Sequence, residues 1–377
     1  MSFLHFGQQR DVFFWQFWRD IYWPLVGGVL LLGLVGIAVL YSVADSDISP
    51  WAWRHGMRLL LGLGIMLAVA AIDLRTLFNV AYLAYGVILI LLLVVALFGE
   101  TGMGAQRWLD FGVVRLQPSE FMKLTLVLAL ARYYQNVHQD DVSLSYFLIV
   151  PILLIGLPAL LIFQQPDLGT SIVLIITGLG VLFLAGVNWR YFAIGGGLAI
   201  AAIPVVWQQL RDYQKDRVLV FLNPERDPSG AGYHIIQSKI GIGSGGFLGK
   251  GFGEGTQSRL NFLPEKHTDF IFTIFAEEFG FVGCFFLFLV FVAILFMIFR
   301  IATIMRNPFS RLVTLGIGFS LFVYLAVNLA MVTGMAPVVG LPLPFISHGG
   351  TSLLTFMIGI GIILCLERQN HTDLPRS

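Results

Sequence analysis

A single aspartate at the start of an apolar segment is the strongest candidate for acid–base chemistry in this 377-residue chain. Asp269 lies in "EKHTDFIFTIFAEEFG", where charged residues run directly into an apolar stretch that also holds Glu277 and Glu278. Ionisable groups inside an apolar helix are expensive unless they are paired or hydrated, so each is a functional candidate. Two ordinary roles stay open: Asp269 as a helix N-cap, and the glutamates as partners of another span or of a partner helix.

The helical spacing separates the two glutamates. At about 100° per residue, Glu277 lies about 80° from the direction of Asp269 and Glu278 lies about 180° away. We therefore expect Glu277 to support a substrate in the same cleft as Asp269, and Glu278 to pack against something else.

Basic residues gather in a second segment, "GMGAQRWLDFGVVRLQPSEFMK". Arg107, Arg115 and Lys123 could seat an anionic headgroup, because arginine binds phosphate oxygens with a rigid fork and lysine binds them as a point charge. Glu120 and Lys123 are neighbours on one helical face. The alternative for Lys123 is an ammonium that extends outward to the membrane surface. Asp167, in "QQPDLGT", adds an acid at the same membrane level.

The composition defines the elements that must position these residues. The chain is 57% hydrophobic and 12% charged, against roughly 25% charged residues in a soluble domain. We therefore predict an all-α integral membrane protein with about ten transmembrane helices, at about 20 residues each, in a single polytopic domain over 1–377. The apolar runs lie at 22–43, 55–72, 77–98, 118–135, 146–163, 169–187, 190–209, 270–300, 311–335 and 350–367.

The charge distribution bears on orientation and partners. With a net charge of +1, the chain has no field that would attract a polyanion, so a nucleic-acid partner is not expected. Ten spans put both termini on one side of the membrane. Short segments on that side hold ten arginines, against five basic residues in the short loops on the other side. The positive-inside rule then places both termini in the cytoplasm and the large 210–269 loop, between spans 7 and 8, outside.

That large loop contains the glycine-rich stretch "GIGSGGFLGKGFGEG". Gly241, Gly243 and Gly246 fit G-x-G-x-x-G, but the strand–turn–helix context of a nucleotide site is absent and the Walker pattern fails, so we exclude both. Loops of this length are usually functional, and we expect short or re-entrant helices in it, for example at "YHIIQSKIGI". His348, in "LPLPFISHGGTS", is a weak candidate for a base because no acid lies near it in the sequence.

Five motifs in this order resemble the SEDS family (shape, elongation, division and sporulation), and most closely its RodA branch: "GAQRWLDFG…LQPSE", "QPDLGTS", "NPERDPSGAGYHIIQSKIGIGSGGFLGKGF", "GTQSRLNFLPEKHTDFIFTIFAEEFG" and "LPLPFISHGGTS". The resemblance covers nearly the whole chain. It implies a ten-span protein of the bacterial inner membrane that polymerises peptidoglycan from lipid II, with its site facing the periplasm. It also implies a class B penicillin-binding transpeptidase as partner, within the elongation machinery.

The resemblance carries over to particular residues. The family's essential acid falls on Asp269, and its other important polar positions fall on Arg107, Gln117, Glu120, Lys123 and Asp167. His348 departs from the pattern, since related proteins usually carry tyrosine there.

These expectations combine into one mechanism. Asp269 would deprotonate the acceptor sugar, while Arg107 and Lys123, with Arg115 or a divalent cation (Mg or Mn), would stabilise the departing undecaprenyl pyrophosphate. Lys266, beside the aspartate, joins the predicted substrate contacts. A lipid II flippase and a non-catalytic scaffold for the transpeptidase are the alternatives.

Overall fold

The computed structural model describes residues 18–102, 105–110, 115–138, 142, 145–210, 212–227, 230–259, 266–372 and 374. Within these residues, ten helices have 17 or more residues, and each falls on one of the ten predicted apolar runs. They are α2 (Trp23–Val43), α3 (Ala52–Ala70), α4 (Leu74–Phe98), α5 (Pro118–Gln135), α6 (Ser145–Gln164), α7 (Leu168–Leu184), α8 (Trp189–Gln209), α12 (Ile271–Ile304), α13 (Pro308–Val332) and α14 (Gly350–Arg368).

The length and apolar composition of its helices make this chain a multi-pass membrane protein. The predicted class of helical integral membrane protein is confirmed. Seven of the described helices are long and apolar enough to cross a membrane: α2, α4, α6, α8, α12, α13 and α14. α7 is apolar but shorter, and α5 carries Glu120, Lys123 and Arg132. The number of ten spans therefore stays a prediction.

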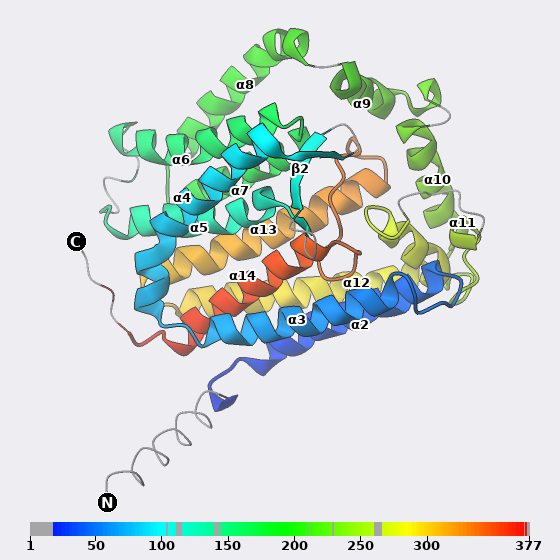
Figure 1. Cartoon of the computed structure of the whole chain (residues 1–377), viewed down its shortest axis with the longest axis horizontal. Coiled ribbons are helices and arrows are strands. Elements are labelled where there is room, and N and C mark those ends of the chain that lie inside the picture. The colour runs from blue at the N-terminus through cyan, green and yellow to red at the C-terminus, as the bar shows by residue number, and fades with distance from the viewer. Residues whose placement is uncertain are drawn as a thin grey trace, which may run out of the picture.

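α5 lies at the centre of the bundle, next to α4, α7 and α13, as Figure 1 shows. Its side chains from Met122 to Ala131 are all buried, which is typical of a helix surrounded by other helices. Gly316 of α13 permits the close approach, because a Cβ there would lie only 2.6 Å from Val127 of α5. α8 contrasts with α5, since none of its residues is buried and it stands apart from the bundle in Figure 1.

Two regions outside the ten long helices complete the fold. A three-stranded antiparallel sheet of order β1-β2-β3 lies between α4 and α5, and the all-α prediction did not include it. Its strands are β1 (Glu100–Gly102), β2 (Ala105–Asp110) and β3 (Arg115–Leu116). The segment between α8 and α12 holds α9 (Asp212–Leu222), a 3-10 helix (Pro224–Arg226), α10 (Ala231–Ser244) and α11 (Thr256–Arg259). The short helix predicted at "YHIIQSKIGI" is confirmed as α10.

Candidate active site

Asp269 lies in a turn that leads into α12. The helix begins at Ile271, its N-cap is Phe270, and no side chain caps it, so the N-cap role considered for Asp269 is wrong. The carboxylate is half-buried and packs against the backbone of the loop before α14. A Cβ added to Gly340, whose φ is +74°, would lie 3.4 Å from Asp269 Oδ2. The positive φ favours a glycine there, whereas a Cβ at this distance would make an ordinary van der Waals contact with the carboxylate.

The backbone around Asp269 is fixed at three consecutive carbonyl oxygens. The backbone N–H of His348 donates to the oxygen of His267 (2.9 Å), and the Ser347 hydroxyl donates to that of Thr268 (2.6 Å). The Asn328 amide donates to the oxygen of Asp269 (3.1 Å) and to that of Leu341 (2.7 Å). The loop before α14 and one residue of α13 thus hold the "HTD" backbone, which limits the positions that the Asp269 carboxylate can adopt.

A cationic group that the sequence analysis did not select lies beside this turn. Arg58 of α3 has its Nη1 atom 3.0 Å from Nε2 of His348. Since the guanidinium only donates, His348 must accept at Nε2 and carry its proton on Nδ1. Burial, together with the charge of Arg58, lowers the pKa of His348 to about 3, so this imidazole is neutral and a poor base. Arg58 and His348 are 290 residues apart, and no local pattern pointed to their contact.

The aromatic and basic neighbours of Asp269 shape the same region. The imidazole of His267 stacks on Trp51, with ring centroids 4.8 Å apart, and its centroid is 6.1 Å from that of His348. Lys266 is buried, and burial lowers its pKa while the charge of Asp45 acts in the opposite direction.

The predicted basic cluster is organised around an ion pair inside the bundle. Lys123 Nζ lies 2.7 Å from Glu120 Oε1, and both residues are buried. Tyr324 of α13 donates its hydroxyl to the same carboxylate oxygen (2.7 Å), and its ring centroid lies 4.1 Å from Lys123 Nζ. The shared helical face of Glu120 and Lys123 is confirmed. The outward extension considered for Lys123 is wrong, because the paired ammonium stays inside.

The sequence motifs "LQPSE" and "QPDLGTS" meet in space, through Gln117 and Asp167. Gln117 precedes α5 and its amide donates to Asp167 Oδ2 across 3.5 Å. Asp167 is the N-cap of α7 and accepts from the backbone and hydroxyl of Thr170. The Arg115 side chain is exposed on β3, and its carbonyl accepts from Thr351 at the start of α14. Arg107 belongs to β2, but its side chain lies outside the described part of the structure.

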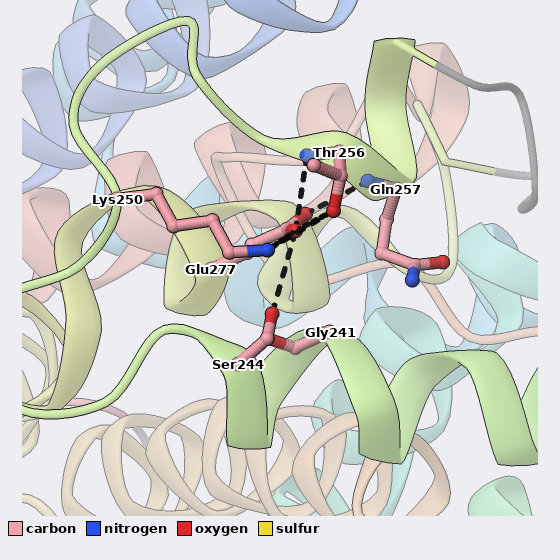
Figure 2. A network of polar contacts seen from close by, with 6 residues as sticks. All are labelled: Gly241, Ser244, Lys250, Thr256, Gln257 and Glu277. Atoms are coloured by element: carbon pink, nitrogen blue, oxygen red, sulfur yellow. Dashed lines mark hydrogen bonds and ion pairs between the residues drawn. The ribbon is translucent and has the colours of Figure 1, made fainter.

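The two adjacent glutamates of α12 have different partners. Glu278 accepts a hydrogen bond from Ser42 of α2, which confirms that it packs against another helix. Glu277 is bound by the stretch from the last residue of α10 to the start of α11 (Figure 2): Ser244, Lys250, Thr256 and Gln257 all donate to its carboxylate. All of these donors belong to the protein, and contact of Glu277 with substrate stays a prediction.

Among the residues that the structure describes, no group of three or more histidine, cysteine or acidic side chains could hold an ion. The divalent cation considered from the sequence therefore stays a prediction, and no step is derived through it.

The fold and the bound turn are those of a multi-pass membrane protein with a candidate active site, and comparison with known proteins identifies the family. The model of the FtsW/RodA/SpoVE cell cycle proteins matches residues 19–372. This chain belongs to that family, which confirms the resemblance seen in its motifs.

Named relatives and solved structures agree with this assignment. The peptidoglycan glycosyltransferase MrdB of Escherichia coli K12 is 43% identical over 93% of this chain and 95% of its own. MrdB of Helicobacter pylori 26695 is 36% identical over 91% and 89%. A chain from a peptidoglycan synthase complex that coordinates polymerization and crosslinking matches with a TM-score of 0.83 and 32% identity, over 94% of this chain and 99% of that one. The rod shape determining protein RodA of Thermus thermophilus matches with a TM-score of 0.71 and 28% identity, over 94% and 98%.

Proposed function

We propose that Asp269 is the general base of a glycosyl transfer that lengthens peptidoglycan strands from lipid II. The chain is a peptidoglycan glycosyltransferase, like its curated relatives at 36–43% identity over most of its length. The observation that carries the proposed role is the fixed turn. Three consecutive carbonyls are bound, so the backbone that carries the carboxylate is held in place.

In the proposed reaction, Asp269 accepts the proton of the 4-hydroxyl on the acceptor sugar. The hydroxyl oxygen attacks the anomeric carbon of a lipid-linked donor from the side opposite its pyrophosphate. A new glycosidic bond forms as the bond to the pyrophosphate oxygen breaks, and undecaprenyl pyrophosphate leaves with the bonding electrons. The configuration at the anomeric carbon is inverted. General-base assistance of this kind contributes about 10²- to 10⁴-fold in rate.

Cations near the outer ends of the helices are proposed to stabilise the departing pyrophosphate. Arg107 and Arg115, on the strands that lead into α5, are the candidates for direct contact. Arg58 adds a third guanidinium beside the Asp269 turn through His348. Lys123 is neutralised by Glu120, and we propose that it acts through that pair rather than as a separate charge. Lys266 is proposed as a further substrate contact.

The protein is a multi-pass protein of the bacterial inner membrane. We propose that both termini lie in the cytoplasm and that the site faces the periplasm, with the 210–269 loop contributing part of it. The proposed partner is a class B penicillin-binding transpeptidase of the elongation machinery. The synthase complex among the structural neighbours, which joins polymerization to crosslinking, supports this pairing.

The test is lipid II polymerisation by purified protein that carries Asp269→Asn, with a transpeptidase-inactive partner present. We expect the rate to fall by about 10²-fold or more, as the loss of a general base predicts. Glu225→Gln is the matched control, because it neutralises an exposed acid of the same large loop and should keep the parental rate. Parental activity in a folded, inserted Asp269→Asn variant would remove Asp269 from this role.

A further inference from the structure

α12 is interrupted at Gly280. At the interruption, backbone amides of the helix donate to residues outside it rather than to the preceding helical turn. Gly280 has φ 63° and ψ −162°, which are not helical values. In a continuous helix, the amides of Phe281 and Val282 would donate to the carbonyls of Glu277 and Glu278. Here Phe281 donates to the oxygen of Gly246 (3.0 Å) and Val282 to that of Phe247 (3.1 Å).

The carbonyls left over by this break also bond to the same segment, residues 244–257, which we name the glycine loop. The amide of Lys250 donates to the Glu277 oxygen (3.0 Å) and that of Gly251 to the Glu278 oxygen (3.0 Å). Contact this close requires glycine, since a Cβ on Gly249 would lie 2.1 Å from the Glu278 oxygen. The glycine loop thus satisfies the backbone groups that a break inside a membrane helix would otherwise leave unpaired.

The Glu277 side chain also binds the glycine loop, and we call this set of side-chain bonds the lock. The side chain is 0% exposed. Its Oε1 atom accepts from Lys250 Nζ (2.7 Å), the Thr256 amide (3.0 Å), the Thr256 hydroxyl (2.6 Å) and the Ser244 hydroxyl (3.4 Å). Its Oε2 atom accepts from the Gln257 amide (3.0 Å). Figure 2 shows these donors converging on the carboxylate from the two ends of the glycine loop and, through Lys250, from its middle.

This arrangement is suited to a carboxylate and to no neutral isostere. Both oxygens face N–H or O–H donors, so a glutamine would turn its own NH₂ group toward at least one of them. A buried donor left without an acceptor is costly. The charge also attracts Lys250, the ionic partner, and charge-assisted bonds are stronger than neutral ones.

The lock acts on the part of α12 that carries the proposed base. Residues 271–279 form the first segment of the helix, which starts two residues after Asp269 and ends at the Gly280 break. Glu277 lies about 9 Å along the helix axis from Ile271, the first residue of the helix, at 1.5 Å per residue. At this break the helical hydrogen bonds of Phe281 and Val282 are replaced by bonds to the glycine loop, so contacts with that loop contribute to the angle between the two segments.

We propose that Glu277 is a positioning residue for the glycosyl transfer. Its carboxylate locks the glycine loop into the break of α12, and the locked break sets the orientation of the segment that presents Asp269. The expected effect on rate rests on the proposed function. The binding of the glycine loop by Glu277 does not, because it is a structural property that can be measured separately.

The first measurement is the distance between the glycine loop and the second segment of α12. Spin labels are placed at Leu248→Cys and Phe299→Cys, both exposed, with Cys284 and Cys365 replaced by alanine. Phe299 is about 27 Å along the helix from Phe281, which suits pulsed electron resonance. We expect one narrow distance distribution in the parent and in the Glu254→Gln control, an exposed acid of the same loop. Glu277→Gln should broaden it.

The second measurement is lipid II polymerisation by the unlabelled variants, below the temperature at which each begins to unfold. We expect Glu277→Gln to lower kcat at least fivefold with KM changed less than twofold, because a misplaced catalytic group slows the chemical step. Lys250→Arg should restore most of the rate that Lys250→Met loses, since it keeps the charge and the donor. Glu254→Gln should match the parent.

Both effects are required. A narrow distance distribution in Glu277→Gln, or a kcat within fivefold of the parent, overturns the positioning role. If Glu277→Gln fails to fold, the comparison of Lys250→Met with Lys250→Arg decides by the same two criteria. Full activity of Asp269→Asn would overturn the proposed base and leave the distance measurement unaffected, so the two failures are distinguishable.

Discussion

Two lysine–glutamate pairs in this protein have the same N–O distance but differ in sequence separation, exposure and hydrogen-bond partners. Glu120–Lys123 and Glu277–Lys250 are each 2.7 Å apart. The first joins residues three apart on α5, and its lysine and glutamate side chains are only 3% and 5% exposed. The second joins residues 27 apart, with a lysine that is 28% exposed and a glutamate that is fully enclosed.

The difference concerns how the buried charge is shared. The Glu120 carboxylate has Lys123 and the Tyr324 hydroxyl as its described partners, and neither pair member reaches solvent. Glu277 has hydrogen bonds from Thr256, Gln257 and Ser244 besides Lys250. Breaking a buried pair by removing one partner leaves a charge without compensation. The pair on α5 should therefore be much more sensitive to the loss of its lysine than the pair at the glycine loop.

The largest expected effect is that of Lys123→Met. It leaves the Glu120 carboxylate in the bundle with the Tyr324 hydroxyl, and we expect a loss of about 3–5 kcal/mol in the free energy of unfolding. The measurement is denaturant unfolding of the purified protein in detergent. Glu120→Gln/Lys123→Met is the control, since it removes both charges and should recover most of the loss. A single variant as stable as the double one would contradict this account.

Lys250→Met should have a smaller effect, of about 1 kcal/mol in the same experiment. Glu277 keeps its other hydrogen-bond donors in this variant. The effect is also small because the Lys250 side chain is partly exposed to solvent in the parent protein. A loss as large as that of Lys123→Met would mean that Lys250 alone compensates Glu277, and the distinction between the two pairs would fail.

The third test concerns a half-buried cation contact that contains no acid, Arg58–His348. The pKa of His348 is lowered from 6.5 to about 3 in the folded protein. Between these values the unfolded chain binds more protons, so stability should be lost as the pH falls from 6.5 toward 3. His348→Gln should make the decrease of the melting temperature from about pH 7 to about pH 5 shallower. His138→Gln, at an exposed position, should leave the slope unchanged, and equal slopes for all three proteins would contradict the contact.

The sequence predicted the parts of this protein that depend on neighbouring residues. Apolar runs placed ten helices because the length and polarity of a span are local properties. The pairing of Glu120 with Lys123 followed from helical spacing for the same reason. Gln117 and Asp167 were selected separately, from two different motifs, because nothing in either motif indicates that the two side chains meet.

Asp269 shows the limit of what the sequence alone predicts. The order of motifs selected it, but helical periodicity extended α12 back over it, and the structure begins the helix at Ile271. The difference arises because Asn328, Ser347 and the backbone of His348 bind the preceding turn from distant parts of the chain. A regular helix model of 269–280 also missed the break at Gly280.

By itself, the amino-acid sequence determined the membrane class, the positions of the helices, the family and the identity of the candidate base. Only the tertiary structure decided how that base is held, which glutamate faces the glycine loop, and that Arg58 lies against His348. The physical reason is that the length of an apolar run and its helical periodicity depend only on residues that are close together in the sequence. Hydrogen-bond partners of buried polar groups are instead chosen among segments that folding brings together, such as Lys250 and Glu277 or Ser42 and Glu278.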